Sequence, residues 1–291
     1  MFNSKKQKTL TYSKIEDYFV NKEQLQRYKK KMLLSDEIIV LTNNNSGTSI
    51  NFNLDYFGDS QIEFINSSFN KLIITSNKNE SNIIKFTNCS INDGEITGSK
   101  NIANLHLEHC SIKKLNASAK VININDLIVD NHNLCGLKLG NNKTYKVTIN
   151  NRDDKKTPMI LNIETHDLEI NNCNINLISK CDTIKLNDTI ATLRYVDKTQ
   201  NIFLNNSSIS PYISNGKTIS FPLVITSGNS KIKDLHLEIG TLCVQKNSDI
   251  LPTNTTLEIS NLLILSSNTS IDTKNTGDCF IISNNILRKK D

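Results

Sequence analysis

The stretch Ile84-Lys-Phe-Thr-Asn-Cys-Ser-Ile91 is one copy of a phrase that recurs along the chain. Two apolar residues flank a single residue, and a third apolar residue follows five positions later. Other clear copies begin at Ile62, Leu105, Leu168 and Ile202. A period of roughly 20 residues is the signature of a solenoid, in which each unit packs only on its neighbours. The repeat therefore predicts an architecture, whereas no motif in the chain predicts a chemistry.

Two kinds of solenoid fit this phrase. Residues 102–112 match the leucine-rich-repeat pattern L-x-x-L-x-L-x-x-(N/C)-x-L, in which a strand alternates with a helix or an extended arc. The segments between copies, such as 92–98 and 246–250, instead favour turns and strands and contain few leucines. We therefore expect strands on every side of the coil, with a leucine-rich-repeat-like solenoid as the alternative.

Two of the copies contain adjacent Asn residues after the second apolar position. Leu168-Glu-Ile-Asn-Asn-Cys-Asn-Ile175 and Ile202-Phe-Leu-Asn-Asn-Ser-Ser-Ile209 are similar to the motif I-x-I-x-N-N-x-I. In these repeats the chain resembles the right-handed parallel β-helix superfamily typified by pectate lyases and tailspikes. The resemblance implies an all-β, single-stranded right-handed parallel β-helix, and the spacing gives about 11 rungs. Such motifs specify backbone shape rather than activity.

Asparagine is unusually common, at 43 of 291 residues, whereas the chain has only 10 Gly. Asn tolerates the left-handed backbone conformation that tight corners require, so we expect Asn to replace Gly at the corners of the coil. Its amide can also hydrogen-bond to the same position in the next rung, which would form a ladder. Abundant Asn and abundant Ile thus have one common structural cause.

Charge and pattern divide the chain into three regions. Residues 1–36 are basic and contain two capping boxes, Ser13 with Glu16 and Asn21 with Gln24, which predict two short helices that form an N-terminal cap. Residues 37–285 form the predicted β-solenoid, and 286–291 form a basic C-terminal tail. The repeat slips in phase near 130–165 and 210–235, so we expect loops to leave the coil there.

The cysteines and the N-terminus bear on the cellular compartment. The chain has seven Cys, and Cys89, Cys110 and Cys173 occupy the same place in their repeats. Buried, free thiols that stack as small apolar fillers explain this better than a metal or redox column. No apolar stretch follows Met1 as a signal peptide would require, so we expect a cytoplasmic protein, with delivery by a non-classical route left open.

Two charged clusters are the candidate sites. The segment 152–158 combines acids and bases beside Pro158, and carbohydrate-active enzymes of the β-helix type use such carboxylates. Here Asp153 and Asp154 are the candidate catalytic residues. The candidate binding residues of this segment are Arg152, Lys155 and Lys156.

The second cluster lies on the polar side of the second predicted helix. Its candidate binding residues are Arg27, Lys29, Lys30 and Lys31, which could attract an anionic membrane or nucleic acid. The five histidines never show a metal-ligand spacing. His106 and His109 could form an acid-base pair with Glu108, against the simpler interpretation of a solvated surface. We predict no cofactor and no metal site.

These features favour a non-enzymatic β-solenoid that serves as a recognition or scaffolding surface for a protein or glycan partner. A carbohydrate-active lyase or hydrolase that works at the 150–158 loop is the first alternative. An effector protein delivered without a classical signal peptide is the second. The exposed strand edges at the ends of a solenoid would also allow the protein to form oligomers.

Overall fold

The structure is a computed structural model. It describes residues 7–11, 38–42, 48–54, 61–76, 82–97, 102–128, 136–151, 158–211, 218–233, 236–245, 249–253, 256–265, 280–283 and 286–289. The chain divides into two compact units, Met1–Asn150 (unit 1) and Asn151–Asp291 (unit 2). Regular structure in the described residues is β-strand, and these residues form no α-helix.

Unit 1 contains thirteen strands. They are β1 (Gln7–Thr11), β2 (Ile38–Thr42), β3 (Thr48–Asn53), β4 (Gln61–Ile65), β5 (Ser68–Thr75), β6 (Ile83–Thr87), β7 (Ser90–Thr97), β8 (Ile102–Glu108), β9 (Ser111–Ile112), β10 (Lys114–Ala117), β11 (Ala119–Asn125), β12 (Gly136–Gly140) and β13 (Lys146–Asn150).

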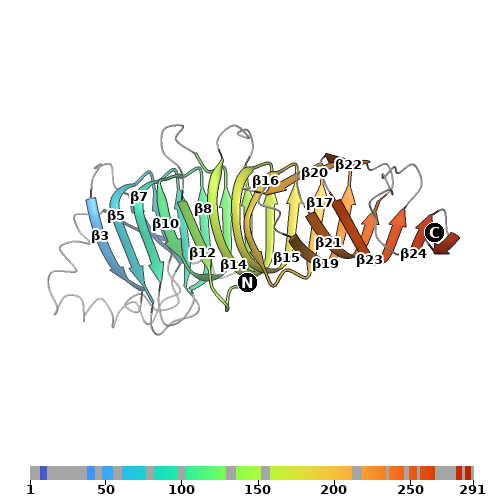
Figure 1. Ribbon diagram of the computed structural model, residues 1–291. Helices are drawn as coiled ribbons and strands as arrows, with labels where there is room; N and C mark the ends of the chain where they lie inside the picture. The colour runs from blue at the N-terminus through green and yellow to red at the C-terminus, as the bar shows by residue number, and fades with distance from the viewer. Residues whose placement is uncertain are drawn as a thin grey trace, which may run out of the picture. The chain divides into compact units, whose positions relative to one another are not determined.

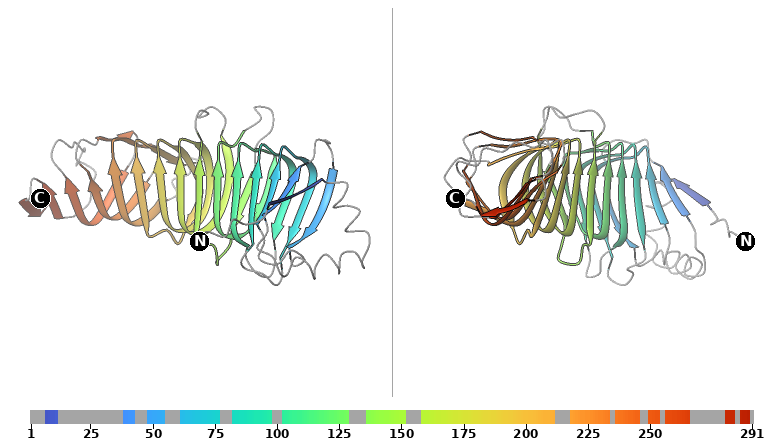
Figure 2. Two further views of the ribbon diagram at one scale, coloured as in Figure 1. Left: turned by 180° about the vertical axis from the view of Figure 1, so that it is seen from behind. Right: turned by 90° about the vertical axis from the view of Figure 1, so that its right-hand side faces the viewer.

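The strands of unit 1 pair in parallel in two sets, so that the chain visits each set once per turn (Figures 1 and 2). The first set runs β2, β4, β6, β8, β11 and β13. The second runs β3, β5, β7, β10 and β12. Each strand thus pairs with the strand one turn away, which is the arrangement of a parallel β-solenoid.

The interior of unit 1 consists of columns of apolar side chains. The first apolar position of each repeat forms one column, in which every member is buried: Ile62, Ile84, Leu105, Ile122 and Val147. In the next column, the rings of Phe64 and Phe86 stack with centroids 4.7 Å apart and an interplanar angle of 7°. Each fully buried side chain of this size contributes about 1.5–3 kcal/mol before conformational entropy is counted.

Unit 2 contains twelve strands. They are β14 (Met159–Asn171), β15 (Asn174–Asn187), β16 (Ile190–Asp197), β17 (Asn201–Asn205), β18 (Ser208–Pro211), β19 (Thr218–Ser227), β20 (Asn229–Lys233), β21 (His236–Val244), β22 (Asp249–Thr253), β23 (Thr256–Leu265), β24 (Phe280–Ser283) and β25 (Ile286–Lys289).

Unit 2 has the same two-sided pairing. One set contains the second half of β14, the second half of β15, and then β17, β19, β21, β23 and β24, all in parallel. The other contains the first halves of β14 and β15, followed by β16, β18, β20 and β22. β25 pairs antiparallel with β24, so the solenoid pattern ends at this strand pair.

The corner between the two sets has a repeated backbone geometry. One residue after the first-set strand has a positive φ at each of these positions: Asn66, Asn88, His109, Asp126, Asn172, Asp188, Asn206 and Gly228. Four of the eight are Asn, as the sequence predicts, because Asn tolerates this region of backbone space better than most other residues. The residue that follows is small and buried in most copies, and it turns its side chain into the corner.

The predicted all-β parallel β-solenoid is confirmed, and strands on both sides of the coil replace the helices of a leucine-rich-repeat arrangement in the described residues. Eight corners with the repeated geometry are described, and the predicted count of roughly 11 rungs depends in part on residues outside the described ranges. The predicted N-terminal helices also lie outside the described ranges. Within 1–36, only β1 is described, and it pairs with β2.

The predicted loops near 130–165 and 210–235 are absent where β12, β13, β19, β20 and part of β14 occupy about half of these residues. The segments 129–135, 152–157 and 212–217 lie outside the described ranges, and the prediction stays untested there. The strands form where they do because turns differ in length without loss of pairing. Hydrogen-bonded Asn side chains on adjacent turns are 25 residues apart at Asn125 and Asn150, but 16 apart at Asn171 and Asn187. The repeated phrase therefore slips while the strand register continues.

Candidate interaction surfaces

The outer side of the first strand set in unit 1 is polar. The central outward position of successive strands is occupied in register by Glu63, Lys85, His106, Asn123 and Thr148. Asn123 Nδ2 lies 3.4 Å from His106 Nδ1, and the amide donates to this ring nitrogen in the tautomer that carries its proton on Nε2. The central row of this face is therefore polar, whereas Ile83 and Val121 in the neighbouring outward row are partly exposed apolar residues.

The two histidines of this region have different partners. Burial lowers the pKa of His106, and the positive charge of Lys85 lowers it further. His109 lies at a corner with φ of 51°, and its Nδ1 is 3.6 Å from Asp126 Oδ2. Glu108 pairs instead with Lys85, at 3.5 Å between Oε2 and Nζ. The three residues therefore do not form the acid-base pair considered from the sequence.

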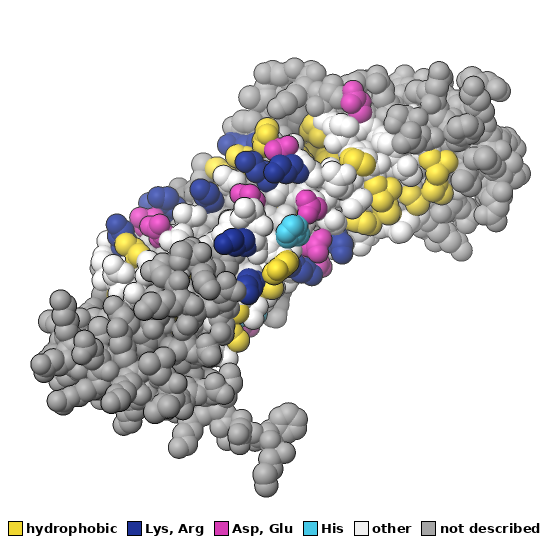
Figure 3. All heavy atoms as spheres, turned by 90° about the horizontal axis from the view of Figure 1, so that it is seen from below, with side chains coloured by type: hydrophobic (Ala, Val, Ile, Leu, Met, Phe, Trp, Pro, Cys, Tyr) yellow, Lys and Arg dark blue, Asp and Glu magenta, His cyan; other side chains and the backbone are white. Residues whose placement is uncertain are grey.

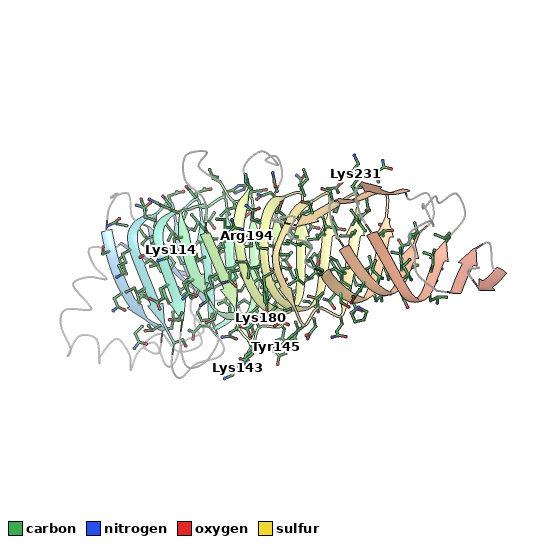
Figure 4. All side chains as sticks on the ribbon, viewed as in Figure 1. Lys114, Lys143, Tyr145, Lys180, Arg194 and Lys231 are labelled. Atoms are coloured by element: carbon green, nitrogen blue, oxygen red, sulfur yellow. The ribbon has the colours of Figure 1, made fainter. Side chains whose placement is uncertain are left out.

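The outer side of the second strand set in unit 1 bears several lysines. Lys71, Lys113, Lys114 and Lys138 are exposed, and Lys114 points away from the sheet (Figure 4). Lys114 Nζ lies 3.4 Å from Asp93 Oδ1, with both side chains largely in solvent. Exposed ion pairs of this kind contribute about 0–1 kcal/mol, so this face is a solvated surface of mixed charge.

In unit 2, the counterpart of the first strand set contains β17, β19, β21 and β23, and its outer side changes character along its length. Its central outward row begins with Glu169 and Lys185 and continues in register through Phe203, Ile225, Cys243 and Ile264. The adjacent outward row contains Leu223, Thr241 and Leu262. The "apolar patch" comprises the six partly exposed side chains Phe203, Leu223, Ile225, Cys243, Leu262 and Ile264.

The apolar patch covers four strands, β17, β19, β21 and β23. Strands spaced by about 4.8 Å with about five residues each give it an area on the order of 300 Å². Patches of this size are often functional in soluble proteins. In the surface view of Figure 3, hydrophobic side chains gather in a stretch apart from the charged ones.

The borders of the apolar patch are polar. Lys185 Nζ lies 5.9 Å from the ring centroid of Phe203, within the range of a cation-π contact. The row that follows the patch along each strand contains Asn205, Ser227 and Gln245. An apolar centre with a polar rim is the usual composition of a protein interface.

Asparagine forms the predicted ladders at the ends of the first-set strands. In unit 1, Asn150 Nδ2 donates to Asn125 Oδ1 at 2.8 Å. In unit 2, Asn187 Nδ2 donates to Asn171 Oδ1 at 2.6 Å, and Ser227 Oγ donates to Asn205 Oδ1 at 3.0 Å. The ladder position immediately precedes the corner residue with positive φ, so Asn serves two adjacent structural roles.

Three of the thiols lie in the corner between the two strand sets, directly after the residue with positive φ, and are buried as predicted. We call the stack of these positions on successive turns the corner column. Cys89, Cys110 and Cys173 are buried and each donates to the carbonyl two residues earlier, at 3.2–3.4 Å. Ser207 donates in the same way at 2.7 Å. A neighbouring thiol and burial raise the pKa of Cys89, and burial raises that of Cys181 to about 12. The hydrogen bond with Cys89 lowers the pKa of Cys110, so the pKa shifts of this adjacent pair are in opposite directions. The thiols are buried structural groups, and the described residues contain no group of three or more side chains suited to a metal.

A close contact between a histidine and an aspartate in unit 2 was not predicted from the sequence. His166 Nδ1 lies 2.6 Å from Asp182 Oδ2, and both side chains are 54% exposed. The two residues are one turn apart, and this turn length of 16 residues is the only signal that could have indicated the contact. Because the pair is solvated, we assign it to the surface of the coil rather than to a reaction centre.

The sequence-predicted site residues cannot be placed, because all of them lie outside the described ranges. They are Arg27, Lys29, Lys30, Lys31, Arg152, Asp153, Asp154, Lys155 and Lys156. Their roles stay predictions. In the part of the chain that the structure describes, no helix has the length and apolarity to cross a membrane. No protein-family model, curated protein or solved structure matches the chain.

Proposed function

We propose that this protein is a non-enzymatic recognition or scaffolding protein that binds a protein partner through the apolar patch. The observation that supports this is the change along one sheet face of unit 2, from Glu169 and Lys185 to a continuous row of Phe203, Ile225, Cys243 and Ile264. A coil does not need apolar residues on its wet side, since the interior columns already supply the packing. Covering the patch would remove apolar surface from water, which favours association.

A protein partner fits this patch better than a glycan. Sugars are bound through hydroxyl groups, which need hydrogen-bonding side chains, whereas the centre of the patch has aliphatic and aromatic groups. The polar face of unit 1 suits a glycan in principle, but its Lys85, Glu108, His106 and Asn123 already pair with one another.

Site-specific photo-crosslinking tests the proposal. A photoreactive amino acid at Ile225, in cells that make the protein, should give a discrete polypeptide product. That product should disappear when Leu223 and Ile264 are both changed to Lys. The same probe at Ile190, which is 43% exposed on the other strand set of unit 2, is the matched control. Equal products at both positions would contradict the proposal.

A second experiment addresses the enzymatic alternative. Acidic polysaccharides are screened for cleavage by the wild-type protein and by the variant with Asp153→Ala and Asp154→Ala. We expect no turnover from either protein. Cleavage that is lost in the double variant would overturn a non-enzymatic function.

We also propose that the chain belongs with the right-handed parallel β-helix superfamily. The I-x-I-x-N-N-x-I repeats and the parallel pairing of successive turns support this placement. An experimental structure that traced a left-handed coil would reject it.

A further inference from the structure

We propose that Cys89 and Cys110 are a dithiol site, at which hydrogen peroxide closes a disulfide between two adjacent turns of unit 1. The two thiols lie in the corner column, away from the apolar patch, so this inference does not depend on the proposed function. In the reduced protein they are the buried structural groups already described. Oxidation turns them into a covalent link between turns.

Strand pairing places Cys89 and Cys110 at the same position on successive turns. Before the corner, β6 pairs with β8, and after it Ser90 of β7 lies opposite Ser111 of β9. The backbone is also hydrogen-bonded at the corner itself, where Ser111 N donates to Cys89 O at 2.8 Å. In-register Cα atoms on paired strands are about 4.8 Å apart, inside the range of roughly 4.4–6.8 Å found for disulfides.

The two side chains have the same orientation. Each follows a residue with positive φ, 53° before Cys89 and 51° before Cys110, and each donates to the carbonyl two residues earlier. Each sulfur also lies near a carbonyl oxygen of the preceding turn, at 3.3 Å from that of Phe64 in the first case and 3.7 Å from that of Phe86 in the second. Both thiols therefore project into the same corner, where a hydrogen bond joins them.

This hydrogen bond gives the two thiols different roles. It raises the pKa of Cys89, and burial raises that pKa further. It lowers the pKa of Cys110, against the opposing effect of burial. Cys110 is therefore the thiol that more readily becomes a thiolate, which is the form that peroxide oxidises. Cys89 is the resolving thiol.

The reaction balances with hydrogen peroxide as the oxidant. The Cys110 thiolate attacks one peroxide oxygen, the O–O bond breaks, and hydroxide leaves and takes up the proton that Cys110 released. The product is a sulfenic acid at Cys110. Cys89 Sγ then attacks the sulfur of this sulfenic acid, and the hydroxyl group leaves as water with the proton of Cys89. The two thiols lose two electrons in total, and one peroxide is reduced to two waters.

Burial limits the rate of the reaction, and the neighbours of each thiol decide its selectivity. Cys89 and Cys110 are 2% and 1% exposed, so the oxidant reaches them only when the corner opens locally. The buried Cys173 shares the corner column, but its neighbour on the next turn is Thr189, whose Oγ1 accepts from Cys173 N at 3.4 Å. Among the cysteines that the structure describes, only Cys89 and Cys110 occupy the same position on adjacent turns.

The strand spacing predicts that the link is reversible. Cβ atoms joined by a disulfide are about 3.5–4.5 Å apart, which is less than the spacing of about 4.8 Å between paired strands. Closing the bond therefore draws two turns together and strains them. Strained disulfides are more easily reduced than relaxed ones.

Peptide mapping of the full-length protein tests the inference. Trypsin cuts between the two cysteines, which fall on the peptides 86–100 and 101–113. The folded protein is treated with hydrogen peroxide, alkylated in denaturant and digested. The two peptides should then appear joined by a disulfide, and reduced glutathione, added before alkylation, should separate them. Cys173 is the internal control and should stay open to alkylation.

Single serine variants separate the roles of the two thiols. In Cys89→Ser, the sulfenic acid at Cys110 has no resolving thiol, so dimedone should trap it. In Cys110→Ser, neither a link nor a dimedone adduct should form at Cys89. Cys173→Ser makes the same change in unit 2 and should form the link at the wild-type rate.

The mapping of the wild-type protein decides the inference even if a serine variant does not fold. Joined peptides 86–100 and 101–113, with Cys173 still alkylated, support it. Absence of the joined pair, with Cys110 either alkylated or oxidised to a sulfinic acid, overturns it. Links that involve Cys173 as often as Cys89 would come from unfolded chains and would overturn it as well.

Discussion

The two units differ in where phenylalanine lies at the central positions of their paired strands, although Phe221 of unit 2 is fully buried, as Phe64 and Phe86 of unit 1 are. In unit 1, the rings of Phe64 and Phe86 stack inside the coil and are fully buried. In unit 2, the equivalent interior positions are aliphatic, at Ile170, Leu186 and Leu204, whereas Phe203 faces outward. The comparison teaches that the interior columns accept any well-packed apolar residue, and that the outward row distinguishes one unit from the other.

The largest expected difference between the units concerns these phenylalanines. Phe64→Ala removes a ring that contacts three other rings, Phe52, Phe69 and Phe86, and should lower the free energy of unfolding by about 3–5 kcal/mol. Phe203→Ala removes a partly exposed ring and should cost about 1 kcal/mol or less. Urea unfolding measures both. Similar losses for the two variants would mean that the outward row of unit 2 is part of the packing and would remove the contrast.

The next test compares one glycine in each unit. Gly228 has a φ of 60°, and a Cβ there would collide with the side-chain amide of Asn206 on the neighbouring turn. Gly136 has open space around its Cα, with no atom within 4 Å of an added Cβ. We expect Gly228→Ala to destabilise by about 1–3 kcal/mol and Gly136→Ala to be neutral or to stabilise by up to about 1 kcal/mol. Thermal unfolding of the two variants measures this, and a loss for Gly228→Ala no larger than that for Gly136→Ala would contradict the corner geometry.

The repeat predicted which side chains are buried inside the coil. It did not predict which outward side chains lie next to one another on neighbouring turns. The offsets of two and seven place Ile84, Phe86 and Ile91 inside, and all three are buried. Asn corners and buried thiols followed from the same register. The apolar patch was not predicted, because in the sequence Phe203 and Ile225 are each a single apolar residue next to a buried position. Only the pairing of turns of different length brings them into one row, and those lengths cannot be read from a degenerate phrase.

The corner column allows a smaller test of how alike the two units are. Cys110 in unit 1 and Cys173 in unit 2 occupy positions that Ser67 and Ser207 occupy on other turns. Because a hydroxyl can donate to the same carbonyl, Cys110→Ser and Cys173→Ser should each change the free energy of unfolding by about 1 kcal/mol or less. Chemical denaturation provides the measurement. A larger loss at Cys110 alone would mean that its contact with Cys89 distinguishes the corner of unit 1.

The smallest expected effect is a pH dependence that belongs to the polar face of unit 1. Burial and Lys85 lower the pKa of His106 in the folded protein below its ordinary value of about 6.5. As the pH falls below about 6.5, the unfolded chain therefore binds a proton before the folded protein does, so stability decreases until the folded pKa is passed. Since His106 is only half buried, solvent screening keeps the decrease in the free energy of unfolding well below about 1 kcal/mol. His106→Asn should flatten this part of the profile when unfolding is measured between about pH 7.5 and pH 5. If the variant and the wild type lose stability in parallel, the Asn123 contact does not hold the ring in its neutral form, and the polar face of unit 1 is as solvated as an isolated strand surface.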